Sequence, residues 1–392
     1  MRVLFYTWIL FVGFQNIWSQ PLLVVVLMVK NEASVIEATL QPFVDGGVKD
    51  FLIFDTGSTD GTQQVVSSFF KRHNITDAYV VEQPFIDFAT SRNCALDAVH
   101  FYFPQATFML MPDAEWYMHN AQGLLQFCAA HQYDYHASYF VPIRSDALGF
   151  YTSRLIRCRQ GIRFVGVVHE TLNRLTYVML PDDIYFEWRS SLNGNKKSSQ
   201  RWLRDRDILL TSYAKNPSDS RTLFYLGQTY ECLHDWENAY TYYKKRAEIK
   251  GWDEEDFMTQ YRLGRVAQMI TTPHRKFGVP LPIQHYLAAV ALRPHRAEPV
   301  IQIAKYYADV GDIQLAFLYA SRAVKIAYPT KDLLFVERDL YDFARYDLLG
   351  ICAWYVGEYE LGEWAVRKAL EVKPHAEHLH YYLKLYADRK SG

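Results

Sequence analysis

Two carboxylates, Asp113 and Glu115, directly follow the apolar run Phe108–Met111. Such a run is typical of a buried strand, and an unpaired charge is too costly to bury. These side chains must therefore be solvated, paired or bound to a metal. Two earlier apolar runs end similarly, one at Lys30-Asn31-Glu32 and the other at Asp55. Three strand ends that carry acids to one edge of a sheet predict a functional site there.

The first half of the chain alternates apolar runs with segments of helical pattern. Runs at 22–29, 51–54, 78–82 and 108–111 predict strands, and the segments 33–44, 63–73 and 87–100 between them predict helices. Parallel strands need crossover helices, so this alternation predicts an α/β domain with a Rossmann-like, mostly parallel sheet. Further strands are expected at 135–142, 149–157 and 185–188.

The sequence of the loop after the first strand indicates which kind of ligand the site could bind. No G-x-G-x-x-G follows that strand, so a dinucleotide site is not indicated. An acidic site without a glycine cradle would repel a diphosphate unless a divalent cation lay between them. Arg92, near the start of a predicted helix, could add a phosphate contact. The expected cofactor is therefore Mn²⁺ or Mg²⁺.

Four motifs occur in the order VKNE, DTGSTDGT, the helix carrying Ser91-Arg92-Asn93, and PDAEW. In this order they resemble the family-2 nucleotide-sugar glycosyltransferases of the GT-A fold. PDAEW is similar to that family's metal-binding DxD motif, with Glu115 in place of the second Asp. The resemblance implies a nucleotide-sugar donor, of which a UDP-linked sugar is the expected kind. The donor-binding residues that it implies are Lys30, Asn31, Glu32, Asp55, Arg92, Asn93 and Asp113.

The stretch RFVGVVHE at 163–170 is similar to one in bacterial members of the same family. A His-Glu pair taken alone is more typical of an exposed turn. In the context of the resemblance, His169 joins Asp113 and Glu115 as a metal ligand. Glu170 is the candidate general base that deprotonates the acceptor, and Asp146 is the alternative base.

From Trp202 onward the pattern is helical and repeated. Tetratricopeptide repeats place small residues where the two helices of a pair touch, and four irregular repeats suffice for a continuous core. The Tyr and Trp side chains of this half are expected in that core, while its concave face could bind a polypeptide. Small residues twelve positions apart occur as Gly227 and Ala239, Ala304 and Ala316, and Gly350 and Gly362.

The expected organisation is a signal peptide or anchor at 1–20, a GT-A domain at 21–200 and tetratricopeptide-like repeats at 201–392. The polar stretch 189–200 is expected to be a linker, or else a lid that brings Lys196 or Lys197 to the diphosphate. A functional leader would place the chain in the secretory pathway or at a membrane, and otherwise it would be cytoplasmic.

Composition excludes some partners. A net charge of −1 gives no electrostatic case for nucleic acid. The five cysteines are scattered and show no CxxC, so neither a disulfide framework nor a zinc site is indicated. A dimer formed through the repeats stays open.

The predicted function is a metal-dependent, inverting glycosyltransferase of the hexosyltransferase type that acts on a polypeptide, glycan or lipid. The repeats favour the polypeptide. The alternative is a helical-repeat interaction protein with a degenerate, non-catalytic GT-A domain, which is motivated by Glu115. A nucleotidyltransferase is disfavoured because the first loop is not rich in glycine and basic residues.

Overall fold

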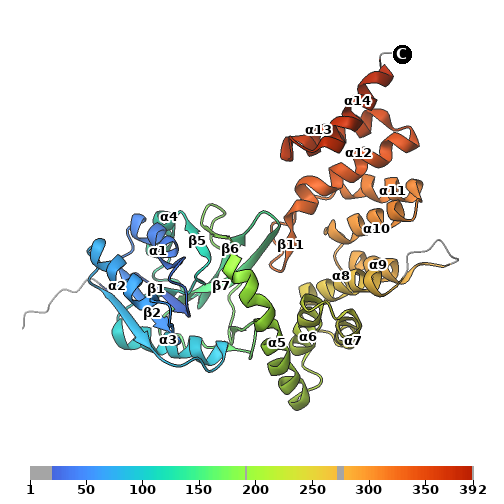
Figure 1. Cartoon of the computed structure of the whole chain (residues 1–392). Coiled ribbons are helices and arrows are strands. Elements are labelled where there is room, and N and C mark those ends of the chain that lie inside the picture. Colours follow the sequence, from blue (N-terminus) through green and yellow to red (C-terminus); the bar gives the residue numbers. More distant parts are fainter. Residues whose placement is uncertain (1–19, 190–191, 272–277, 391–392) are drawn as a thin grey trace, which may run out of the picture.

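The computed structural model describes residues 20–189, 192–271 and 278–390, so the leader predicted at 1–20 lies outside it except for Gln20. A sheet region built from residues 20–189 adjoins an arc of paired helices that extends away from it (Figure 1). Among the described helices, none combines the length and the apolar character that a membrane span requires.

The sheet region is built on nine strands in the order β3-β2-β1-β4-β7-β6-β10-β5, with β11 paired to β7. A two-stranded sheet of β8 and β9 lies beside it. The strand bounds are β1 Leu23–Val29, β2 Asp50–Asp55, β3 Ala78–Glu82, β4 Phe108–Leu110, β5 Trp116–His119, β6 Ser138–Arg144, β7 Leu148–Arg157, β8 Phe164–Val165, β9 Thr171–Leu172, β10 Tyr185–Trp188 and β11 Val336–Glu337.

The prediction of a mostly parallel sheet is wrong. Strands β3, β2, β1 and β4 are parallel neighbours, but β7 runs antiparallel to both β4 and β6. Strands β5 and β11 are also antiparallel to their partners. The physical reason is that β6 and β7 follow each other through a tight turn, which can join only antiparallel strands.

Helices cover both faces of the parallel strands. Alternate residues of β1 point to opposite faces, so Val25 and Leu27 pack with one group of helices while Val24 and Val26 pack with another. The first group is α1 (Ile36–Asp45), α2 (Thr62–Arg72) and α4 (Ala121–Ala130), and the second is α3 (Phe88–Tyr102). This layering explains why β1 is apolar at every position.

The remaining helices form the arc. Residues 192–200, expected as a linker or lid, are instead the start of α5, and the expected division at 200/201 falls inside that helix. The side chains of Lys196 and Lys197 lie outside the described part of the chain. The helix bounds are α5 Leu192–Lys215, α6 Ser220–Cys232, α7 Trp236–Ala247, α8 Asp253–Ile270, α9 Leu281–Leu292, α10 Glu298–Asp309, α11 Ile313–Ala323, the π-helix η1 Leu340–Ala344, α12 Arg345–Val356, α13 Tyr359–Val372 and α14 Glu377–Lys390.

The small residues of the repeats lie where paired helices touch, as predicted. A Cβ atom added at Gly227 would lie 2.5 Å from the Tyr243 ring, and one added at Gly264 would lie 2.4 Å from Cε1 of Tyr286. Both tyrosine side chains are fully buried. The helix pairs α6–α7 and α8–α9 therefore approach too closely for any larger residue at these glycines.

We expect Gly264→Ala to lower the free energy of unfolding by about 1–2 kcal/mol, because overpacking outweighs the better helix propensity of Ala. Urea denaturation followed by circular dichroism measures the change. The second variant, Tyr286→Leu, removes the ring that the new methyl group meets. In the Tyr286→Leu background the same Gly264→Ala exchange should cost less, and an equal cost would show that the close approach is not the cause.

One extended segment joins the repeats to the sheet. We call residues 328–338, between α11 and η1, the strap. Its strand β11 pairs with β7, and the backbone N–H of Tyr151 donates to the Leu333 carbonyl at 2.9 Å. The backbone N–H of Arg338 donates to the carbonyl of Ala147 at 3.0 Å. Figure 1 shows β11 reaching from the arc of helices toward the sheet. Strand β7 is thus bonded to a segment that follows it by almost half the chain.

Candidate functional site

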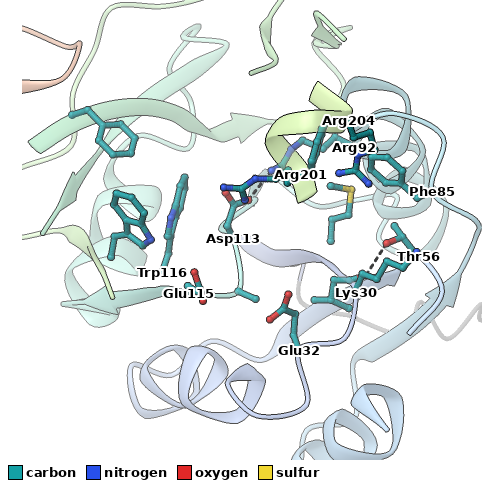
Figure 2. Close-up of a pocket in the computed structure, with 16 residues that line it drawn as sticks. Lys30, Glu32, Thr56, Phe85, Arg92, Asp113, Glu115, Trp116, Arg201 and Arg204 are labelled. Carbon is teal, nitrogen blue, oxygen red and sulfur yellow. Dashed lines mark hydrogen bonds and ion pairs between the residues drawn. The ribbon is translucent and has the colours of Figure 1, made fainter. Parts of the chain in front are cut away.

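A cavity of about 440 Å³ opens beyond the carboxyl ends of β1 and β4. The sheet and α5 both contribute to its wall. Figure 2 shows Arg201 and Arg204, from α5, on the same side of the cavity as Arg92. The lining residues are Met28, Val29, Lys30, Glu32, Thr56, Phe85, Phe88, Arg92, Asp113, Ala114, Glu115, Trp116, Phe150, Trp188, Arg201 and Arg204.

Arg92 on α3 is the centre of a buried charge network at one side of the cavity. Its Nη2 donates to Asp113 Oδ1 at 2.6 Å, and its Nε donates to Glu170. Arg154 on β7 donates to the same Glu170 oxygen at 3.2 Å. The side chains of Arg92, Arg154 and Glu170 are each less than 10 % exposed, whereas Asp113 is partly open to the cavity. Two carboxylates and two guanidinium groups thus neutralise one another.

The network shifts the acidity of its carboxylates. Burial alone would raise the pKa of Glu170, but the positive charges of Arg92 and Arg154 outweigh it and the pKa is lowered. The pKa of Asp113 is lowered by the same balance between burial and the two arginines. Both groups are therefore ionised near neutral pH.

Glu170, the predicted general base, lies in an unsuitable place for that role. A lowered pKa weakens a base, and the side chain of Glu170 is only 6 % exposed and bonded to two arginines. Its observed contacts are those of a structural partner of Arg92 and Arg154. The base function stays a prediction that this geometry does not support.

The predicted metal ligands are not assembled as a centre. Asp113 and Glu115 both line the cavity, but Asp113 is bonded to Arg92. His169 is not among the lining residues, and its ring stacks on Tyr225 of α6 with centroids 4.1 Å apart. Across the described residues no group of three His, Cys, Asp or Glu side chains is placed to hold a metal. The residues present therefore do not fit the expected Mn²⁺ or Mg²⁺, which stays a prediction.

Two predicted donor-binding residues hold the turn after β2. Asp55 is fully buried, and its Oδ1 accepts from the backbone N–H groups of Gly57 at 2.9 Å and Ser58 at 2.7 Å. Asn31 Oδ1 accepts from the N–H of Thr59 at 2.7 Å, which ties the β1 loop to the same turn. These bonds explain why the DTGSTDGT stretch is so rich in small and polar residues.

Of the remaining predicted donor-binding residues, some line the cavity and one makes structural contacts elsewhere. Lys30, Glu32, Arg92 and Asp113 line the cavity. Asn93 faces β8 instead, where its amide donates to the Phe164 carbonyl at 2.9 Å and accepts from the Phe164 N–H at 2.8 Å. Four of the seven residues are thus in position to meet a ligand.

Sequence reasoning missed the arginines and aromatic rings of the cavity. Arg201 and Arg204 are three residues apart and so share one face of α5. Arg204 lies over the Phe85 ring at 5.5 Å, and Trp116 and Trp188 add apolar wall. The spacing of the two arginines is a usable signal, but it falls just after the stretch 189–200 that was expected to be a linker.

Comparisons with known proteins give matches to solved structures alone. No family model and no curated protein matches the chain. Matching solved structures include MamA at 17 % identity, which covers 47 % of this chain and 96 % of MamA with a TM-score of 0.37. YrrB, described as a TPR protein with an unusual peptide-binding site, matches at 15 % identity over 48 % of this chain and 86 % of its own, with a TM-score of 0.36.

A third match is the C-terminal part of a TPR repeat-containing protein from Cytophaga hutchinsonii. It is 17 % identical and covers 48 % of this chain and 66 % of its own, with a TM-score of 0.38. At these identities and TM-scores, the likeness says nothing about what this chain binds.

These findings correct the family resemblance. The solved structures reported above are helical-repeat proteins. The prediction of a family-2 glycosyltransferase, with its GT-A fold and its sugar-transfer function, is therefore wrong. The mixed sheet departs from the predicted fold as well. Of the resemblance, only the tetratricopeptide repeats are left.

Proposed function

We propose that this chain is an interaction protein whose helical repeats bind polypeptide segments in an extended conformation. The observation that carries the proposal is the way in which the repeats hold the strap. The Glu254 carboxylate at the start of α8 accepts from the backbone N–H groups of Leu333 at 2.8 Å and Leu334 at 2.7 Å. Arg296, just before α10, donates to the carbonyls of Leu334 at 3.4 Å and Phe335 at 3.0 Å.

Main-chain recognition of this kind suits a polypeptide ligand, because every peptide offers the same N–H and C=O groups. Glu254 and Arg296 are buried under the strap, so these charged bonds are made away from water. Charge-assisted hydrogen bonds are stronger than neutral ones. The repeats therefore possess the donors and acceptors needed to order an extended chain.

Further along the arc the helices carry exposed aromatic side chains. Tyr355 on α12 is 62 % exposed and Tyr381 on α14 is 61 % exposed. The Tyr355 hydroxyl lies 3.3 Å from that of Tyr382. Tyrosine is enriched at binding surfaces because it offers a large apolar area and a hydroxyl at little cost in conformational entropy. This open part of the repeats is the expected docking place for a partner.

Selection of a random peptide library against the full chain tests the proposal. We expect a peptide consensus whose binding is weakened about tenfold by Tyr355→Ala together with Tyr381→Ala. The matched control is Tyr133→Ala, which removes a 91 % exposed tyrosine of the sheet region. Equal losses in the control would contradict the proposal. Metal-dependent release of nucleoside diphosphate from a nucleotide sugar would contradict a purely interacting role.

A second candidate function concerns the cavity, which we propose as a site for a small ligand that carries an anionic group and an aromatic ring. The supporting observation is that Arg92 Nη1 is buried without a hydrogen-bond partner among the described residues. Arg201 and Arg204 lie on the same side of the cavity (Figure 2). A buried donor without a partner is costly, and an anion would satisfy it.

Calorimetric titration with phenyl phosphate tests the cavity, with phenol as the uncharged comparison. We expect phenyl phosphate to bind and Arg204→Ala to weaken it about tenfold, because one guanidinium group and its stacking on Phe85 are lost. Arg206→Ala is the matched control, since Arg206 is on the same helix and pairs with Asp207. Equal binding of phenol, or equal effects of the two variants, would contradict the proposal.

A further inference from the structure

We infer that the groove under the strap is a binding site for a second polypeptide, and that the strap is the competitor that fills it in the free protein. The ligand class is an extended segment in which an acidic residue precedes two aliphatic residues and an aromatic one. The strap supplies this pattern as Asp332-Leu333-Leu334-Phe335. The inference rests on the proposed function, because it names the partner and the regulation of the repeats' polypeptide site.

Charge complementarity defines the acidic position. The Asp332 carboxylate is bonded to Arg293 at 2.9 Å, to His295 at 3.0 Å and to Arg296 at 3.0 Å. These three residues lie in the turn between α9 and α10. Asp332 itself is almost fully buried. Arg296 also pairs with Glu298, and Arg293 also pairs with Asp253. An acid at this position of the ligand completes the network and is therefore favoured there.

The next positions are defined by apolar contacts. Leu333, Leu334 and Val336 are buried, and the Phe335 ring lies 5.9 Å from the ring of Phe150. The guanidinium group of Arg262 on α8 lies over the same Phe335 ring at 5.6 Å. The groove therefore pairs main-chain bonds with side-chain contacts, which together give both affinity and selectivity.

The strap does not fit its own groove without strain. Phe335 has a φ of 42°, which a residue with a bulky side chain rarely adopts. Backbone strain of this kind persists only where the surroundings enforce it, and it gathers at switch regions. A separate polypeptide, free of the connections to α11 and η1, could make the same contacts with relaxed backbone angles. The tether to α11 and η1 therefore helps to keep the strap in the groove despite this strain.

A charge reversal within the strap tests the inference. Asp332→Lys places a cation against Arg293, His295 and Arg296, and so should expel the strap while leaving the groove unchanged. The matched control is Asp309→Lys, which makes the same exchange at an exposed residue of α10 outside the strap. The probe is a fluorescein-labelled peptide of residues 328–338, and fluorescence anisotropy measures its binding to the full chain.

We expect Asp332→Lys to bind the probe at least about tenfold more tightly than the wild type and the control, because the apparent affinity scales with the fraction of open groove. A probe with Lys in place of Asp332 should not bind. Equal affinity for all three proteins would overturn the competition while leaving polypeptide binding intact. No binding by any of them, with Tyr355-dependent selection still observed, would overturn this groove but not the proposed function.

Hydrogen exchange on the wild type adds a measurement that needs no variant. The amides of Leu333 and Leu334 should exchange through local opening, faster than the central amides of α8 and α10. Addition of unlabelled peptide should speed their exchange further, since it competes for the groove. Exchange as slow as that of α8, and unaffected by the peptide, would show that the strap never leaves and would overturn the inference.

Discussion

Replacing Arg296 by Met should lower the free energy of unfolding by about 3–5 kcal/mol, because the exchange leaves a carboxylate buried without its cation. Arg296 and Glu298 are both fully buried and form a bidentate ion pair. Its shortest distance, from Arg296 Nη2 to Glu298 Oε1, is 2.7 Å. Glu298 would keep only neutral donors, among them the Tyr341 hydroxyl at 2.6 Å. Chemical denaturation of the full chain at neutral pH measures the loss.

Two controls separate this burial effect from the loss of any arginine. Arg338→Met breaks the exposed ion pair with Asp342 and should cost less than about 1 kcal/mol. Adding Glu298→Gln to Arg296→Met removes the buried charge and should restore part of the stability. If Arg296→Met proved as mild as Arg338→Met, the buried pair would not contribute as described.

Replacing Arg92 by Met should cost about 2–3 kcal/mol at neutral pH, less than the Arg296 exchange because Glu170 keeps Arg154. The loss should also depend on pH. In the wild type the pKa of Glu170 is lowered, so its contribution is complete at neutral pH and disappears as the pH falls through that lowered value. Without Arg92 the pKa of Glu170 rises toward its unfolded value, so the part of the acid-induced loss of stability that comes from Glu170 should shrink, and the two proteins should differ less at low pH.

Urea denaturation from about pH 7 down to about pH 4 compares the two proteins. Arg72→Met is a suitable control, since Arg72 forms an exposed pair with Glu37. Its stability should follow the wild-type pH profile. Parallel profiles for the wild type and Arg92→Met would show that Glu170 does not titrate under the influence of Arg92.

Much of the sheet region could be predicted because its signals are local. The apolar run expected at 22–29 is β1 (Leu23–Val29), and the strand expected at 78–82 is β3 (Ala78–Glu82). The helices expected at 63–73 and 87–100 correspond to α2 and α3. Residues buried on both faces leave a continuous apolar pattern, which needs no knowledge of the partner strand.

Strand direction and the strap could not be predicted in this way. Nothing in the sequence of β7 states whether β4 runs parallel or antiparallel to it, since its direction follows from the β6–β7 hairpin. Strand β11 has two residues and lies between helices, so no periodicity marks it. Its pairing with β7 requires the preceding helices of the arc to fold so that β11 lies beside β7.

The candidate site was predictable in position but not in its contacts. Asp113 and Glu115 do line a cavity at the strand ends. What the sequence could not reveal is that Arg92, on α3, would form ion pairs with Asp113 and Glu170 at once. The type of a residue suggests a role, whereas the neighbour that satisfies its charge is set by the tertiary fold.

The pairing of β11 with β7 also sets an order of events during synthesis. Residues 148–149 leave the ribosome long before residues 336–337. The first residues of β7, which β4 does not reach, must therefore wait with one side unpaired while α5 to α11 are made. An unpaired edge is prone to join other strands, and closing so long a loop is slow. Nascent chains truncated before the strap should therefore aggregate more than those that end just after it.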